Sequence, residues 1–221
     1  MLRSAIILIA QLAPCIFLMF MGWGLSDVRV FLASPARAGF IAVVLAGAIA
    51  VVVLRIDMNP LRKDSSPTGS QSLQLATLLI LSLALLSFLP FADRRGLLTL
   101  KSNYWRYSGL LLFSIAVIVR VAGLKSLGNY FSAYVVLQPN HRLVREGIYR
   151  KIRHPLYLSL LLAPAGVALI FASFLVLPVS FLALLFVRDR IREEECLLAS
   201  HFGRDFEDYC RHSRKLIPFL L

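Results

Sequence analysis

Long apolar runs alternate with short polar stretches along this chain. Four runs cover residues 5–25, 38–54, 73–91 and 107–122, and a fifth covers residues 156–187. A helix needs about 20 apolar residues to cross a hydrocarbon core of about 30 Å. The fifth run is long enough for two helices, with a turn near residues 171–173. Because strand edges cannot stay unpaired in lipid, the pattern predicts an all-α integral membrane protein with about six transmembrane or part-spanning helices.

Composition supports the membrane assignment. The chain of 221 residues is 58% hydrophobic and 16% charged, with a mean hydropathy of +0.75, whereas soluble domains carry about 25% charged residues. The first apolar run follows a single arginine, Arg3, as in a signal peptide. It continues past any plausible cleavage point, and Pro14 before Cys15 disfavours a lipoprotein site. We therefore expect an uncleaved first span.

Cysteine and histidine spacing gives no sign of a metal site. The three cysteines, Cys15, Cys196 and Cys210, are too scattered for a disulfide framework or a metal-binding pair. His201 and His212 are far apart among unrelated residues. We expect no metal and no redox role.

The net charge of +12 follows the predicted topology. If the N-terminus, residues 55–72, 120–154 and 188–221 face the cytoplasm, 18 of the 24 Lys and Arg residues lie on that side. This asymmetry matches the positive-inside rule. Anionic membrane lipids explain the excess of positive charge, so nucleic acid is not an expected partner.

Polar residues that could form a site lie almost entirely in the second half of the chain. We expect residues 1–124 to be a transmembrane helical scaffold and residues 125–221 to be the catalytic region. Residues 64–72 are typical of a flexible linker. Tyr104 and Trp105 suggest that residues 92–106 lie in a membrane interface.

The stretch "REGIYRKIRHPLYLS" at residues 145–159 forms the first polar block. Gly147 permits a tight turn, and Pro155 suits the first position of a helix with His154 as its cap. A helix start flanked by Arg150 and Arg153 would hold a carboxylate or a phosphate.

The same stretch also fits a structural role. Tyr149 and Tyr157 could anchor a basic loop at the membrane surface. Spacing alone leaves an anion site and an interfacial anchor equally open.

The second block is "RDRIREEE" at residues 188–195. Helical spacing puts Arg190 and Glu194 one turn apart on one face. Arg before Glu is the less favourable order for a stabilising pair, which adds weight to a role toward a ligand. A solvated acidic helix face is the structural alternative.

Together the two blocks resemble the isoprenylcysteine carboxyl methyltransferase family. The resemblance rests on the order and spacing of "HRLV" at 141–144, "GIYRKIRHPLY" at 147–157, "RDRIREEE" at 188–195 and "FGRDFEDY" at 202–209. It covers residues 125–218, nearly half the chain. The sequence departs from the family pattern at Phe206, where Tyr is usual, and at Ser159, where Gly is common.

The resemblance implies a membrane methyltransferase that uses S-adenosyl-L-methionine without a Rossmann domain. Arg190 would meet the carboxylate of the substrate. The implied cofactor contacts are Gln138, His141, Arg142, Leu143, Val144, Tyr149, His154, Pro155, Leu156, Tyr157 and Glu194.

The implied reaction moves a methyl group to the carboxylate of a lipophilic acceptor such as a prenylated cysteine. The intact "RDR" favours this acceptor over a phospholipid amine or a thiol, which gives Arg190 nothing to pair with. A membrane sterol reductase and a non-enzymatic scaffold remain further alternatives. The site would face the cytoplasm, at the inner or plasma membrane of a bacterium or the endoplasmic reticulum of a eukaryote.

Overall fold

The fold is a bundle of helices that run up and down between two ends. A computed structural model describes residues 2–56, 69–132 and 142–216. Within these residues the long helices are α1 (Leu2–Trp23), α3 (Pro35–Val53), α4 (Gly69–Arg95), α5 (Asn103–Leu127), α6 (Pro155–Ile170) and α7 (Val176–Phe202). The short ones are η1 (Leu25–Asp27), α2 (Val28–Leu32), η2 (Gly128–Tyr130), η3 (Gly147–Arg150) and α8 (Arg204–His212).

The six long helices lie where the apolar runs predicted them, and the all-α membrane fold is confirmed. Among the described residues, three of them, α3, α4 and α5, are individually long and apolar enough to cross a bilayer. Residues 12–23 and 25–32 form a pair bent by 94° that would make a fourth span. α6 is apolar but has only 16 residues, and α7 is apolar only in its first half, so these two helices fit the part-spanning class.

The turn between α6 and α7 falls at residues 171–175, as the sequence predicted. The predicted linker over residues 64–72 is partly wrong, because residues 69–72 form the first turn of α4. Residues 64–68 lie outside the described part of the chain.

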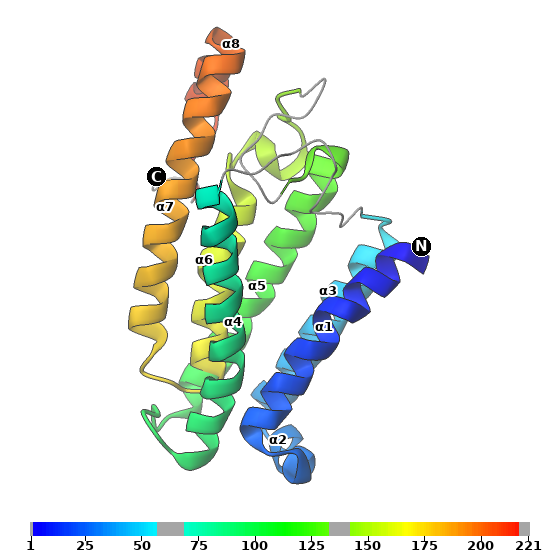
Figure 1. The fold of residues 1–221 in the computed structure, drawn as a ribbon, viewed down its shortest axis with the longest axis vertical. Coiled ribbons are helices and arrows are strands. Elements are labelled where there is room, and N and C mark those ends of the chain that lie inside the picture. Colours follow the sequence, from blue (N-terminus) through cyan, green and yellow to red (C-terminus); the bar gives the residue numbers. More distant parts are fainter. Residues whose placement is uncertain (1, 57–68, 133–141, 217–221) are drawn as a thin grey trace.

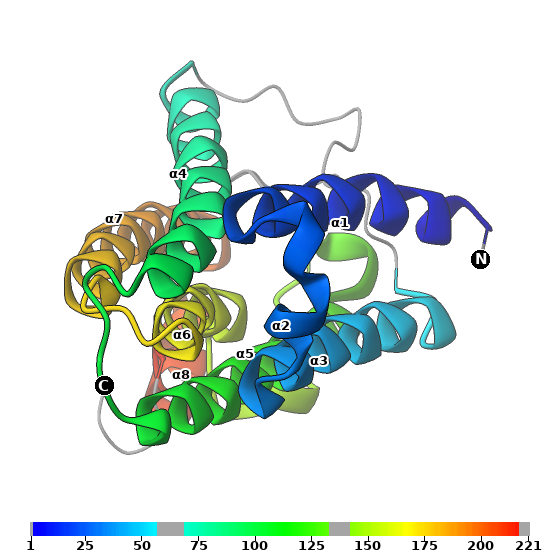
Figure 2. The same ribbon diagram turned by 90° about the horizontal axis from the view of Figure 1, so that it is seen from below.

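The helices pair in an order that places the two polar blocks at one end. α5 and α7 flank α6, α1 packs on α4, and α3 packs on α5 (Figure 2). The end of α5, the start of α6 and the end of α7 meet at the upper end of the bundle in Figure 1. α2 and the turns after α4 and α6 lie at the opposite end (Figure 1).

The backbones of α5 and α6 approach closely at two glycines. A Cβ atom on Gly109 would lie 2.6 Å from the backbone nitrogen of Ile170 and 2.7 Å from the carbonyl oxygen of Gly166. Gly109, Ala116 and Gly123 are all buried and lie seven residues apart on one face of α5. Small residues of this kind allow close packing between helices in membranes.

The lower end of the bundle is held by a buried carboxylate. Asp93 of α4, with a side chain only 2% exposed, pairs with Arg37 of α3 at 3.0 Å and with Arg106 of α5 at 2.5 Å. Arg106 also donates to the carbonyl oxygen of Ile170 at 3.0 Å. Asp93 therefore partly neutralises two arginines inside the protein, and these contacts link α3, α4, α5 and α6.

Gly109→Ala should lower the free energy of unfolding by about 1–3 kcal/mol, because the new methyl group meets backbone atoms that cannot rotate away. Thermal unfolding of the purified protein in detergent would measure the loss. The matched control is Gly69→Ala, where a Cβ atom has nothing within 4 Å. Equal unfolding temperatures for the two variants would contradict the close packing of α5 and α6.

Candidate active site

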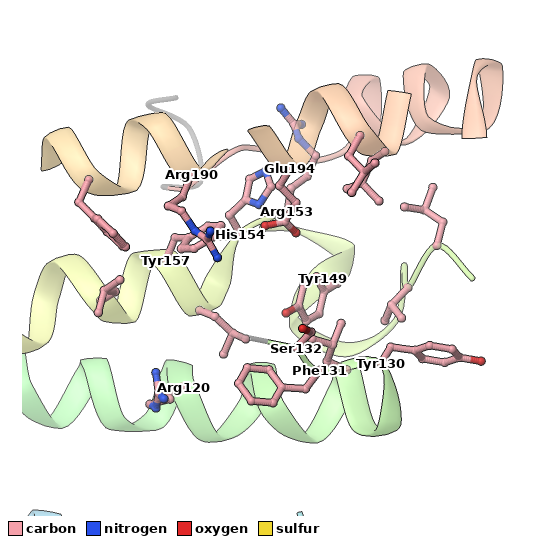
Figure 3. Close-up of a pocket in the computed structure, with 18 of the residues that line it drawn as sticks. Arg120, Tyr130, Phe131, Ser132, Tyr149, Arg153, His154, Tyr157, Arg190 and Glu194 are labelled. Atoms are coloured by element: carbon pink, nitrogen blue, oxygen red, sulfur yellow. Dashed lines mark ion pairs between the residues drawn. The ribbon is translucent and has the colours of Figure 1, made fainter. Parts of the chain in front are cut away.

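A cavity of about 270 Å³ lies at the upper end of the bundle, where α5, α6 and α7 meet the segment around η3 (Figure 3). Leucines from α4, α5, α6 and α7 make most of its apolar wall. Its polar and aromatic lining includes Arg120, Tyr130, Ser132, Tyr149, Arg153, His154, Tyr157, Arg190, Glu194 and Tyr209. The cavity therefore combines an apolar wall with cations and a carboxylate.

α7 contributes an arginine and a glutamate on the face turned toward α6. Arg190 is only 3% exposed, and Glu194 follows it by one helical turn. Figure 3 shows both side chains pointing from α7 into the cavity. The phenol of Tyr157, in the first turn of α6, interacts with both of them. The predicted common face of Arg190 and Glu194 is confirmed.

The start of α6 places a histidine between two carboxylates. His154 occupies the cap position and Pro155 the first helical position, as predicted, but the imidazole does not cap the helix. The ring is instead buried, with 4% exposure. Its Nε2 lies 3.3 Å from Glu195 Oε1, and its Nδ1 lies 3.9 Å from Glu194 Oε1.

Glu195 is the centre of an ion-pair network behind the cavity. Lys215 Nζ lies 2.7 Å from Oε2, and Arg153 Nε lies 3.4 Å from Oε1. Burial alone raises the pKa of the Glu195 carboxyl, but the hydrogen bonds from His154 and Lys215 and the positive charge of Lys215 outweigh it. The resulting pKa is about 2, so Glu195 is ionised at neutral pH.

Residues 213–216 form a strap that holds the chain just before α6. The backbone N–H of Arg153 donates to the carbonyl oxygen of Arg214 at 2.7 Å, and that of His154 donates to Lys215 at 3.0 Å. The backbone N–H of Arg214 donates in turn to the carbonyl oxygen of Lys151 at 2.9 Å. The strap thus fixes both the backbone and the side chain surroundings of His154.

α8 closes the cavity on the same side. The Tyr209 hydroxyl donates to the carbonyl oxygen of Tyr149 at 2.7 Å.

Gly147, which opens η3, has φ of +59°, so the predicted tight turn is confirmed. Burial, and then the charge of Glu194, raise the pKa of the Tyr149 phenol, which therefore stays protonated.

Comparison with known proteins identifies the family. The profile of the isoprenylcysteine carboxyl methyltransferase family matches residues 109–200. Protein-S-isoprenylcysteine O-methyltransferase A of Arabidopsis thaliana is 30% identical over 165 residues, which cover 69% of this chain and 82% of that protein. The chain belongs to the isoprenylcysteine carboxyl methyltransferase family.

Other relatives agree over a shorter length. The probable protein-S-isoprenylcysteine O-methyltransferase of Oryza sativa subsp. indica is 30% identical over 124 residues, which are 53% of this chain and 64% of that protein. The match therefore spans less than two thirds of the rice protein.

A solved structure of the eukaryotic intramembrane Ras methyltransferase of this family has the same fold. It superposes with a TM-score of 0.58 and 20% sequence identity, over 91% of this chain and 74% of that one. This likeness concerns the fold alone.

Most residues that the family resemblance pointed to come together in this structure. The cavity is lined by Leu143, Val144, Tyr149, His154, Leu156, Tyr157, Arg190 and Glu194. Pro155 is fully buried and forms the helix start behind the wall. Arg142 is exposed, with its guanidinium 5.7 Å from the ring centre of Tyr130. Gln138 and His141 lie outside the described residues, and the roles of all these residues remain predictions.

The predicted flanking of the helix start by two arginines is not what the structure contains. Arg150 is exposed and does not line the cavity. Arg153 lines it, but its guanidinium donates to Glu195 and, at 3.1 Å, to the carbonyl oxygen of Cys210. The charge of Arg153 is therefore directed at α7 and α8 and away from the helix start, which itself remains the candidate anion seat.

Sequence reasoning missed two charged residues of the site. Arg120 lines the cavity from α5, and its position inside the apolar run 107–122 was a usable signal, because charged residues within spans are rare and usually functional. Glu195 was hidden in the run of three glutamates. Leu75, Leu78 and Arg120 also show that the cavity draws on residues 1–124, although the division at residue 124 stays a prediction.

The ionised state of Glu195 makes stability depend on pH. Its folded pKa of about 2 lies below the ordinary value of 4.5, so its stabilising contribution is complete above about pH 4.5 and is lost as the pH falls toward 2. Glu195→Gln should be less stable than the wild type at neutral pH and should lack this acid-dependent loss. Thermal unfolding at several pH values would compare them. Parallel pH profiles would show that the network does not hold Glu195 ionised.

Proposed function

We propose that this protein transfers a methyl group from S-adenosyl-L-methionine to the carboxylate of a lipophilic acceptor, with a prenylated cysteine as the model substrate. The observation that carries the proposal is the placement of Arg190 and Glu194 on one face of α7, opposite the start of α6 in a mostly apolar cavity. Relatives in rice and Arabidopsis bear the name protein-S-isoprenylcysteine O-methyltransferase, which agrees with this chemistry.

The described residues fit S-adenosyl-L-methionine. Glu194 offers a carboxylate to its cationic groups. The first-turn N–H groups of a helix have no acceptor inside the helix, so the start of α6 suits the carboxylate of the methionine part. When bound, the cofactor supplies an electrophilic methyl group on a sulfonium. Leu156 and Tyr157 would line its place, and Tyr149, kept protonated, can donate a hydrogen bond.

Arg190 is the residue assigned to the acceptor. A carboxylic acid is ionised at neutral pH, so the attacking oxygen needs no general base. A guanidinium binds a carboxylate through two parallel hydrogen bonds and fixes its plane. Catalysis would then come from positioning within a dry cavity, at some electrostatic cost to the nucleophile.

Arg120 supports a carboxylate as the acceptor group. It lines the same cavity from α5, as do Arg190 from α7 and Arg153 from the segment before α6, whereas among the described residues only Glu194 lines it with a carboxylate. A phospholipid amine is positively charged when protonated, so arginines in the cavity would repel it. A neutral thiol would be bound less strongly by these arginines than a carboxylate. The apolar wall from Leu75, Leu78 and Phe186 suits a lipid-like chain on the acceptor.

We place the cavity at the cytoplasmic face. It lies at the bundle end where the described parts of the segments rich in Lys and Arg gather (Figure 1), and the positive-inside rule assigns such segments to the cytoplasm. A polar cofactor would enter from the water and the acceptor from the lipid. The compartment would be the inner or plasma membrane in a bacterium and the endoplasmic reticulum in a eukaryote.

The experiment that tests this function follows labelled methyl groups from S-adenosyl-L-methionine to S-farnesylcysteine derivatives in lipid vesicles. Formation of a base-labile methyl ester is the expected result. Label that resists base and appears on a phospholipid amine or on a thiol instead would replace this function with the alternative.

Glu194→Ala should weaken S-adenosyl-L-methionine binding by about 1.5–3 kcal/mol, because it removes a hydrogen bond to a charged group. His154→Ala should weaken it by about 0.5–1.5 kcal/mol, the range of a neutral hydrogen bond. Calorimetric or equilibrium-dialysis affinities in detergent would measure the effect. Glu207→Ala, on the exposed face of α8, is the matched control. Wild-type affinity in both site variants, with unchanged unfolding temperatures, would mean that the cofactor binds elsewhere.

Arg190→Lys keeps the positive charge but loses the planar two-pronged donor. Turnover should therefore fall by about tenfold or more, the factor that corresponds to about 1.4 kcal/mol, whereas cofactor affinity should change little. Arg192→Lys, an exposed substitution two residues along α7, is the control. A near wild-type rate for Arg190→Lys would rule out the carboxylate role of Arg190.

A further inference from the structure

His154 is held by one glutamate on the strap side and faces another in the cavity. Its Nε2 lies 3.3 Å from Glu195 Oε1, and its Nδ1 lies 3.9 Å from Glu194 Oε1. His154 and Glu194 line the cavity, whereas Glu195 does not. The two ring nitrogens therefore have different surroundings, although both of the nearby carboxylates come from consecutive residues of α7.

The partners of Glu195 determine which nitrogen carries the proton. Both carboxylate oxygens are occupied: Oε2 by the ammonium of Lys215 at 2.7 Å, and Oε1 by Arg153 Nε at 3.4 Å as well as by His154. Two cations beside one carboxylate keep it ionised. An ionised carboxylate can only accept hydrogen bonds, so the contact with His154 requires a proton on Nε2.

We infer that Glu195 is a positioning residue, which fixes His154 as the Nε2–H tautomer and leaves Nδ1 beside Glu194 as a hydrogen-bond acceptor for a donor group of the cofactor. A carboxylate or carbonyl behind a functional histidine sets its tautomer and ring orientation in the same way in other sites. The inference rests on the proposed function for the identity of the cofactor, but the tautomer itself does not depend on it.

The arrangement gives the cavity a pair of acceptors of different kinds. Glu194 offers a carboxylate and its side chain is 36% exposed, whereas Nδ1 of His154 belongs to an imidazole that is only 2% exposed. S-adenosyl-L-methionine carries donors of both kinds, an ammonium group and uncharged hydroxyl and amino groups. A fixed Nδ1 acceptor would select an uncharged donor, because a buried neutral acceptor does not compensate the desolvation of a cation as well as a carboxylate does.

The tautomer can be measured in the wild-type protein without cofactor. Two-bond proton–nitrogen correlation spectra of protein labelled on its 4 histidines, recorded at alkaline pH, distinguish protonated from unprotonated ring nitrogens. The His154 signals are those lost in His154→Gln. We expect a protonated Nε2 and an unprotonated Nδ1. A protonated Nδ1 in the wild type overturns the inference, whether or not the protein proves to bind S-adenosyl-L-methionine.

Two variants separate positioning from simple support of the fold. Glu195→Ala removes the acceptor, so His154 should become a mixture of tautomers and cofactor affinity should fall about tenfold. Lys215→Met removes an ammonium that touches Glu195 but not the His154 ring. Glu195 keeps Arg153 and stays ionised at neutral pH, so the variant should lower the unfolding temperature while leaving the tautomer and the affinity near wild type. An unchanged tautomer in Glu195→Ala, or an equal loss of affinity in Lys215→Met, would overturn the positioning role.

Discussion

The close contact between α5 and α6 is the constraint on which the site depends. Gly109 and Gly166 let the two backbones meet, and the contact continues upward to Gly123, which packs against Leu156 in the first turn of α6. This fixes the height and rotation of the α6 start relative to α5. Because α7 then packs on α6, the positions of Arg190 and Glu194 follow from the same contact.

Charges in this bundle are placed only where other groups compensate for their burial. Isolated charges are expensive to bury in lipid or in a protein interior. At the lower end, Asp93 has two arginine partners from two other helices. At the upper end, Glu195 is surrounded by Arg153, His154 and Lys215. In both places one carboxylate binds cations from several segments, and it thereby connects parts of the chain that the apolar packing alone would not hold in register.

The length of the apolar runs was sufficient to predict the helices and the hairpin, because the bilayer sets the length of a span and this length appears directly in the sequence. The common face of Arg190 and Glu194 was also predictable, since it needs only helical spacing. The strap was not. Its bonds join Arg153 and His154 to residues about 60 positions later, and no local pattern indicates which distant backbone groups will pair. Glu195 could not be distinguished from its two glutamate neighbours for the same reason.

The position of the site follows from the two solvents that it must connect. A polar donor is stable in water and a lipid-like acceptor is stable in the bilayer, so a reaction between them needs a place where a polar helix start meets an apolar wall. The first-turn N–H groups of α6 have no acceptor inside the helix, and the cavity beside them is lined by leucines of α4 and α5. A histidine buried at this boundary cannot rely on water to orient it. The carboxylate that orients it must therefore come from the protein, and α7 provides Glu195 one residue beyond the glutamate that faces the cavity.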